Sequence, residues 1–66
     1  MAELLTTMKV QRARRDLTQA ELATLAEVTR KSINAIETGR MVPSIVLALR
    51  LAKALQVQVE ELFSLP

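Results

Sequence analysis

The chain has 66 residues, half of them hydrophobic and only one aromatic, which predicts a single small helical domain and argues against a catalytic cleft between two layers. It contains no cysteine and no histidine, so it lacks disulfides, the commonest metal ligand and the usual general base, and we expect no metal, no cofactor and no enzyme activity. The formal net charge is only +2, but the positive excess lies between Met8 and Arg40, a placement that suits binding to a polyanion.

The sequence also argues against a membrane protein. Its longest apolar stretch, residues 41–49, is interrupted by Pro43 and Ser44 and is shorter than the roughly 18 residues that a membrane span needs. The N-terminal segment has an acidic residue where a signal peptide has a basic one. We therefore expect a cytoplasmic protein with no membrane partner.

The first predicted helix runs from Met8 to about Arg15, and Thr7 is a candidate for its capping residue. Met8 and either Val10 or Ala13 face inward, while the basic residues face mostly outward. The apolar spacing is imperfect, so the rotation of this helix is left open between these two alternatives.

The second predicted helix begins at Gln19. Thr18 and Glu21 form a capping-box pattern, in which each side chain accepts a hydrogen bond from a backbone N–H group at the helix start. The residues that recur at helical spacing are Leu22, Leu25 and Ala26. The apolar pattern then fades, so this helix has only about two turns.

A third short helix follows after a tight turn. Thr29 is its predicted cap, Arg30 its first residue, and Ile33 and Ile36 point inward. Gly39, the only glycine in the chain, ends it, because glycine accepts the left-handed backbone found at helix ends. Two short capped helices joined by a tight turn predict a helix-turn-helix motif at about residues 18–38, whose second helix can enter a DNA major groove.

Two further helices are predicted. Ser44 caps the fourth, Ile45 to Leu55, and the fifth covers about Val59 to Phe63. The predicted inward residues of the fourth helix are Ile45, Ala48, Leu49, Ala52 and Leu55. This choice leaves Val46, Leu47 and Leu51 partly unaccounted for, so the helix is apolar around more of its circumference than an ordinary surface helix, and a second buried surface is implied.

A dense set of residues over most of the chain forms a known pattern: Arg12, Leu17 to Ala23, Val28, Thr29, Ile33, Ile36, Glu37, Gly39, Pro43, Ser44, Ala52, Leu55 and Glu61 to Phe63. On these residues the chain resembles the Cro/C1-type (Xre-family) helix-turn-helix domain, and within it short stand-alone repressors such as the cytolysin repressor. The resemblance implies one all-α domain over residues 1–66 with the five-helix lambda-repressor-like fold. It also implies a small antiparallel strand pair of the two termini, Glu3 to Thr6 beside Phe63 to Leu65.

Several positions depart from the family pattern. Relatives usually have an apolar residue at Gln11, so either Val10 takes that place in the core or the first helix is slightly rotated. Asp16 and Glu27 lie at turns where glycine or asparagine is more usual, and many relatives have glycine at Gln56.

Residues near the start of a groove-entering helix read base edges. Arg30 and Lys31 can donate to guanine O6 and N7, Asn34 can bond an adenine edge, and the Ala35 methyl group can contact thymine. The resemblance implies that Arg30, Lys31, Asn34 and Ala35 match base-facing positions. For Arg30 and Lys31 the alternative is a solvated helix start.

The candidate phosphate contacts are Gln19, Ser32, Arg40 and Ser44. Gln19 opens a helix whose backbone N–H groups can bind phosphate oxygens, and the resemblance implies a contact from its side-chain amide as well. Ser32 could instead help to cap its own helix. Such contacts position a protein on DNA without reading the sequence.

Arg12 and Glu37 match two family positions that commonly form a partly buried ion pair between the first helix and the end of the recognition helix. The resemblance implies the same structural pair here. A contact of Arg12 with a DNA phosphate is the alternative.

The last two helices and the tail carry more apolar side chains than a core of this size can hide. Closure of the core is one interpretation. The other is a two-fold dimer interface, formed by Val46, Val59, Leu62, Phe63 and Leu65.

These features together predict a sequence-specific transcriptional regulator of double-stranded DNA. We expect a dimeric repressor that reads a two-fold symmetric operator with helix 30–37 in the major groove. Two alternatives remain: an antitoxin that covers a toxin with its apolar C-terminal surface, and a helical module for protein interaction.

Overall fold

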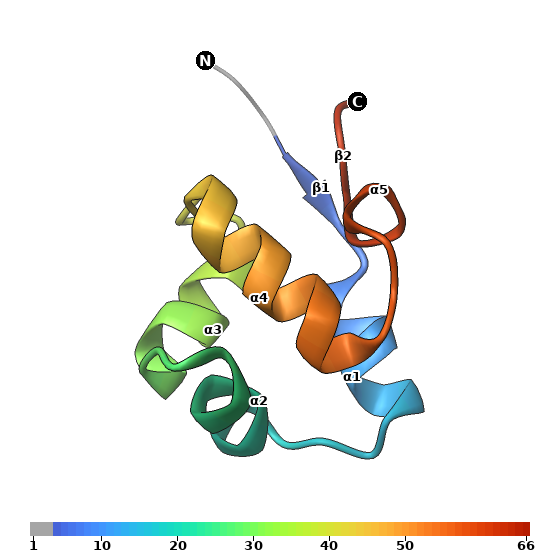
Figure 1. Ribbon diagram of the computed structural model, residues 1–66. Coiled ribbons are helices and arrows are strands. Elements are labelled where there is room, and N and C mark those ends of the chain that lie inside the picture. The colour runs from blue at the N-terminus through green and yellow to red at the C-terminus, as the bar shows by residue number, and fades with distance from the viewer. Residues whose placement is uncertain (1–3) are drawn as a thin grey trace.

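The computed structural model describes residues 4–66, which form five helices and a pair of short strands (Figure 1). The elements in chain order are β1 (Leu5–Thr6), α1 (Met8–Arg14), α2 (Gln19–Ala26), α3 (Arg30–Glu37), α4 (Ile45–Leu55), α5 (Val59–Leu62) and β2 (Phe63–Ser64). The predicted five-helix fold with a terminal strand pair is thus confirmed. The predicted fifth helix ends one residue early, because Phe63 already belongs to β2.

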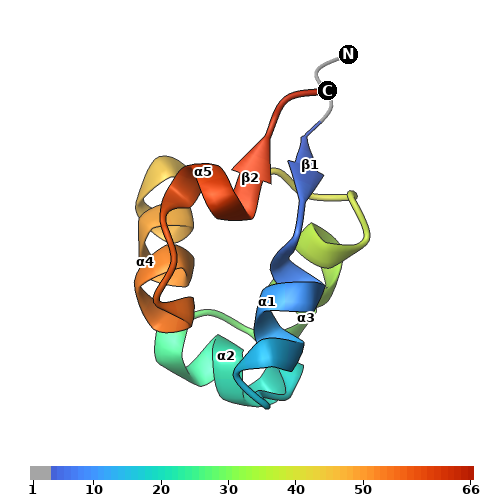
Figure 2. The ribbon, with the colours of Figure 1, turned by 90° about the vertical axis from the view of Figure 1, so that its right-hand side faces the viewer.

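The two ends of the chain are joined by an antiparallel pair in which Leu5 lies opposite Ser64 and Thr6 opposite Phe63 (Figure 2). The Thr6 hydroxyl donates to the Leu62 carbonyl at 3.1 Å, and the Thr7 N–H donates to the same carbonyl at 3.0 Å. These bonds tie the segment before α1 to the end of α5. Glu3, the first residue of the predicted strand, lies outside the described residues.

Thr7 occupies the capping position of α1 without capping it. Its hydroxyl donates to the Glu61 carbonyl at 2.7 Å, and the Met8 N–H donates instead to the Thr6 hydroxyl at 3.1 Å. The expectation that Thr7 caps α1 is therefore wrong, because its side chain serves the contact with the C-terminal segment.

The other predicted caps are present. Thr18 and Glu21 form the complete capping box, with distances of 3.0 and 2.8 Å, at the start of α2. Thr29 and Ser44 each accept a backbone N–H group at 3.1 Å, so α3 and α4 begin where the sequence predicts. Gly39 follows α3 with a left-handed φ of 78°.

The rotation of α1 differs from the expected one. Val10 is 56% exposed, and Gln11, on the inner side, is only 9% exposed. The Gln11 side chain donates to the Thr7 hydroxyl at 3.4 Å, so its polar end has a partner at the edge of the core. Gln11 therefore keeps the inward place of the family pattern, and neither Val10 nor the exposed Ala13 replaces it.

The inward face of α4 also differs from the expected one. Leu47 and Leu51 are buried, whereas Ile45 is 81% and Leu49 is 56% exposed. Because this helix is apolar around most of its circumference, its own spacing does not select a face, and its packing against α2 and α5 does. On α2, Leu25 likewise faces outward, at 57% exposure.

The core lies between all five helices and the start of β2. Its buried hydrophobic residues are Met8, Leu22, Ala23, Ala26, Ile33, Ile36, Leu47, Leu51, Ala52, Leu55, Leu62 and Phe63. Leu62 is completely buried and Phe63 is 9% exposed, so both expected interface residues belong to the core of a single chain. The prediction that Leu62 and Phe63 form an exposed dimer surface is wrong, because both side chains pack in the core. Among the helices of residues 4–66, none combines the length and the apolar character that a membrane crossing needs.

Candidate nucleic-acid interface

The first turns of α2 and α3 border an open hollow on the protein surface, of about 490 Å³. Gln19 from the start of α2 and three residues from α3, Arg30, Lys31 and Asn34, line it. Arg30 and Lys31 are exposed, and Asn34 is partly buried. The caps at Thr18 and Thr29 fix where the two helices begin and therefore which side chains reach the hollow.

Three of the four expected base-reading residues thus lie together. Ala35, the fourth, is partly buried and is absent from the lining. Its carbonyl accepts the N–H groups of Arg40 at 2.9 Å and Met41 at 3.2 Å, so this residue also shapes the turn after α3.

The expected phosphate contacts are more scattered, since only Gln19 lines the hollow. The Ser32 hydroxyl accepts from that of Thr29 at 3.2 Å, which gives it a part in the cap of α3. The exposed Arg40 guanidinium donates to the Thr38 hydroxyl at 3.1 Å, beyond the end of α3. Ser44 caps α4 by accepting the Leu47 N–H at 3.1 Å.

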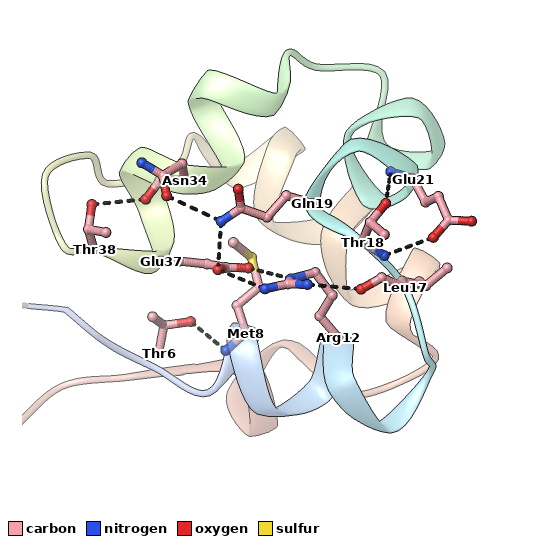
Figure 3. A network of polar contacts seen from close by, with 10 residues as sticks. All are labelled: Thr6, Met8, Arg12, Leu17, Thr18, Gln19, Glu21, Asn34, Glu37 and Thr38. Atoms are coloured by element: carbon pink, nitrogen blue, oxygen red, sulfur yellow. Dashed lines mark hydrogen bonds and ion pairs between the residues drawn. The ribbon is translucent and has the colours of Figure 1, made fainter.

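Behind the hollow, Arg12 of α1 and Glu37 of α3 form a bidentate ion pair (Figure 3). Arg12 Nε lies 2.8 Å from Glu37 Oε2, and Nη2 lies 3.3 Å from Oε1. The remaining Arg12 nitrogen donates to the Leu17 carbonyl at 2.9 Å. The side chains are 17% and 5% exposed, so the pair is a structural link between α1, the following turn and α3.

The charge of Glu37 is stabilised by its neighbours. Burial raises the pKa of its carboxyl, but hydrogen bonds from Arg12 and Gln19, together with the positive charges of Arg12 and Lys9, lower it further than burial raises it. The net pKa lies below the ordinary value of 4.5, and Glu37 is a carboxylate at neutral pH.

The side-chain amide of Gln19 connects the ion pair to the hollow. Its Nε2 donates to Glu37 Oε1 at 3.0 Å and to Asn34 Oδ1 at 3.2 Å (Figure 3). Sequence reasoning missed this link. The spacing of Asn34 and Glu37, which places both on one face of α3, is a signal that could have indicated it.

Known proteins are similar to this chain in sequence and in fold. The sequence profile of the helix-turn-helix family matches residues 8–62. A protein named an uncharacterized HTH-type transcriptional regulator in Methanocaldococcus jannaschii is 43% identical over 56 residues, which are 85% of each protein. One so named in Methanothermobacter thermautotrophicus is 50% identical over 50 residues, covering 74% of this chain and 72% of that protein. The crystal structure of the restriction-modification controller protein C.AhdI from Aeromonas hydrophila is similar, with a TM-score of 0.78 and 31% identity over 82% of both chains.

The chain therefore belongs to the helix-turn-helix family, a family of DNA-binding transcriptional regulators and not of enzymes. Within it, the chain is of the Cro/C1 (Xre) type and has the lambda-repressor-like fold.

Proposed function

We propose that this protein is a dimeric repressor, of the short stand-alone type, that binds a two-fold symmetric operator with α3 in the major groove of each half-site. The observation that carries the proposal is the hollow where Arg30, Lys31 and Asn34 gather at the exposed start of α3. All three side chains can donate hydrogen bonds, and the guanidinium and ammonium groups match the acceptors O6 and N7 of guanine. A polar helix start of this kind suits a groove lined with base edges.

Two of the phosphate contacts in this proposal come from outside the hollow. Arg40 and the start of α4 at Ser44 flank the far end of α3, where they can bind the DNA backbone. Both Nε2 hydrogens of Gln19 have acceptors within the protein, so its side chain offers a phosphate no donor in this conformation. The Gln19 contribution to phosphate binding then comes from the backbone N–H groups of the first turn of α2.

The dimer in this proposal uses exposed apolar side chains at the start of α4 and in the C-terminal segment after β2. Ile45, Val46 and Leu49 are between 56% and 81% exposed, and Leu65 is 75% exposed. Val59 is half-buried and lies at the edge of the core. These segments lie at the end of the molecule opposite α2 in both views (Figures 1 and 2), so a second copy there leaves the start of α2 uncovered. Dimerisation supplies the second recognition helix that a tight, symmetric operator complex requires.

A random-sequence duplex pool tests the proposed function. Protein-bound DNA, recovered and sequenced over several rounds, should converge on a two-fold symmetric site whose half-sites are about 10 base pairs apart, one helical turn. A fluorescence anisotropy titration in increasing salt should show binding that weakens steeply, as counterions are released from the phosphates. An absence of duplex binding even in dilute salt would refute the proposal, and an asymmetric consensus would refute its dimeric form.

A further inference from the structure

A continuous line of polar contacts leads from the interior to the DNA-facing hollow. It runs from Arg12 to Glu37, then to Gln19 and finally to Asn34, with successive distances of 2.8, 3.0 and 3.2 Å (Figure 3). Glu37 at the buried end is 5% exposed, and Asn34 at the other end lines the hollow. The Glu37 carboxylate at the buried end therefore determines, through Gln19, which atoms of the Asn34 amide face a ligand.

The chemistry of each group fixes the orientation of the next one. An ionised carboxylate only accepts hydrogen bonds, so the Gln19 amide must turn its NH₂ group toward Glu37. The second hydrogen of that NH₂ group then points to the Asn34 amide, and only its carbonyl oxygen, Oδ1, can accept this hydrogen bond. Neither amide can be flipped without placing two donors or two acceptors against each other, so the assignment does not depend on a free choice of rotamer.

The Asn34 amide is left with its NH₂ group toward the solvent. Within residues 4–66, Nδ2 of Asn34 donates to no acceptor. Every buried side-chain nitrogen or oxygen in this part of the chain has a hydrogen-bond partner. Since Nδ2 donates to no acceptor there, it is not buried and is accessible to solvent. Figure 3 shows it pointing away from Gln19.

We propose that Asn34 acts on DNA as a hydrogen-bond donor only and therefore selects guanine at its position in the operator. This inference rests on the proposed function and refines it. Guanine presents the acceptors N7 and O6 side by side in the major groove, and the two Nδ2 hydrogens of Asn34 can bind both. Adenine places its N6 donor next to N7, and an asparagine that reads adenine needs its own oxygen for that donor.

Gln19 is the positioning residue in this scheme. To read adenine, Asn34 has to withdraw Oδ1 from Gln19 Nε2 and leave that donor without its partner. We expect the resulting preference for guanine over adenine to be about tenfold, the size of one lost hydrogen bond. The adenine contact expected for Asn34 from sequence is replaced by this guanine contact.

Selection from the same random duplex pool, carried out with variants, tests the inference. The operator position read by Asn34 is the one whose base preference disappears in the Asn34→Ala selection, and the wild-type pool should hold guanine there. Asn34→Asp keeps an acceptor for Gln19 but turns an acceptor toward the DNA, so its pool should change to cytosine, which presents the N4 donor. Gln19→Leu releases Oδ1, so its pool should accept guanine and adenine about equally. Circular dichroism of each variant checks that it is folded.

The outcomes separate the inference from the proposed function. Adenine at the Asn34 position in the wild-type pool, or an unchanged guanine preference with Gln19→Leu, overturns the inference while a symmetric consensus still supports the proposed function. An Asn34→Ala pool that keeps every base preference of the wild-type pool also overturns the inference and still supports the proposed function. A wild-type pool without any consensus overturns both.

A measurement on the protein alone supplies a second test. In NMR spectra of the folded chain, the Gln19 side-chain NH₂ protons should exchange slowly with solvent, and a coupling across the hydrogen bond should connect Gln19 Nε2 to the Asn34 carbonyl. The Asn34 NH₂ protons should exchange rapidly. Slow exchange at Asn34 with rapid exchange at Gln19 reverses the assigned orientation and overturns the inference without reference to DNA.

Discussion

Arg12 and Glu37 are 25 residues apart in the sequence, yet the Arg12 guanidinium holds the Glu37 carboxylate with two hydrogen bonds of 2.8 and 3.3 Å. The pair connects α1 to the last turn of α3, the helix that borders the surface hollow. Gln19 donates to the same carboxylate at 3.0 Å, so the start of α2 is held by the same group. One carboxylate on α3 therefore accepts hydrogen bonds from both α1 and α2.

Loss of Arg12 should destabilise the fold strongly. Arg12→Met leaves the 5% exposed Glu37 carboxylate with Gln19 as its remaining side-chain partner, and we expect the free energy of unfolding to fall by about 3 kcal/mol. The double variant Arg12→Met, Glu37→Met removes both charges and should be more stable than Arg12→Met alone. Urea unfolding of the wild type, both single variants and the double variant measures the coupling. Simple additivity of the two single effects would contradict this account of the pair.

The stability of the protein should decrease in acid, in part through Glu37. Because the folded-state pKa of Glu37 is lowered from 4.5, its contribution to stability is fully present above about pH 4.5 and is lost as the pH falls through the lower folded value. Urea unfolding between about pH 7 and about pH 3 should show this loss, and Glu37→Gln should show a weaker dependence on pH. Some dependence should persist, since hydrogen bonds from the Thr18 backbone and side chain lower the pKa of Glu21 as well. An identical pH dependence in Glu37→Gln and wild type would contradict the assignment.

Glycine at position 56 should stabilise the protein. Gln56 ends α4 with φ 57° and ψ 44°, a left-handed conformation that costs a residue with a Cβ atom about 1 kcal/mol. Gln56→Gly should raise the free energy of unfolding by up to about 1 kcal/mol. Thr38→Gly is the matched control at the end of α3: Thr38 has φ −93°, so glycine there should bring no gain. A loss of stability in Gln56→Gly would show that the conformation carries no strain.

A charge on the exposed face of α4 should prevent dimerisation. Val46 and Leu25 are exposed to nearly the same extent, 58% and 57%, but Val46 lies on α4 and Leu25 on α2. Val46→Glu should yield a monomer in sedimentation velocity, because a carboxylate in an apolar interface loses its hydration. Leu25→Glu, the control, should remain a dimer. If both variants, or neither, become monomeric, the two-fold contact is not on α4.

Lys31 and Arg40 should differ in their effects on DNA binding. Lys31→Ala removes a proposed base-edge donor in the hollow and should reduce the ratio of operator to random-DNA affinity by about tenfold or more. Arg40→Ala removes an exposed charge near the end of α3 and should weaken both affinities alike, with a salt slope smaller by about one. Fluorescence anisotropy on both DNAs at several salt concentrations measures the two quantities. A loss of discrimination with Arg40→Ala would assign it to a base instead.

The sequence by itself determined where α2, α3 and α4 begin and where α3 ends. The hydroxyl groups of Thr18, Thr29 and Ser44 lie within three residues of the N–H groups that they accept, so these starts are encoded locally. Gly39 marked the end of α3 for the same reason. The gathering of Arg30, Lys31 and Asn34 also followed from sequence, because the start of a helix presents neighbouring residues together.

Only the tertiary structure decided which faces are buried and how the polar groups pair. On α4, Leu47 and Leu51 face inward instead of Ile45 and Leu49, because apolar residues surround the helix and its neighbours select the face. The bond of Gln19 to Asn34 spans 15 residues and joins two helices, so the local spacing of Asn34 and Glu37 on α3 indicates a shared face but not the partner that packing brings to it. Non-local contacts of this kind depend on how the helices pack, and here they also determine which atoms of Asn34 face the surface hollow.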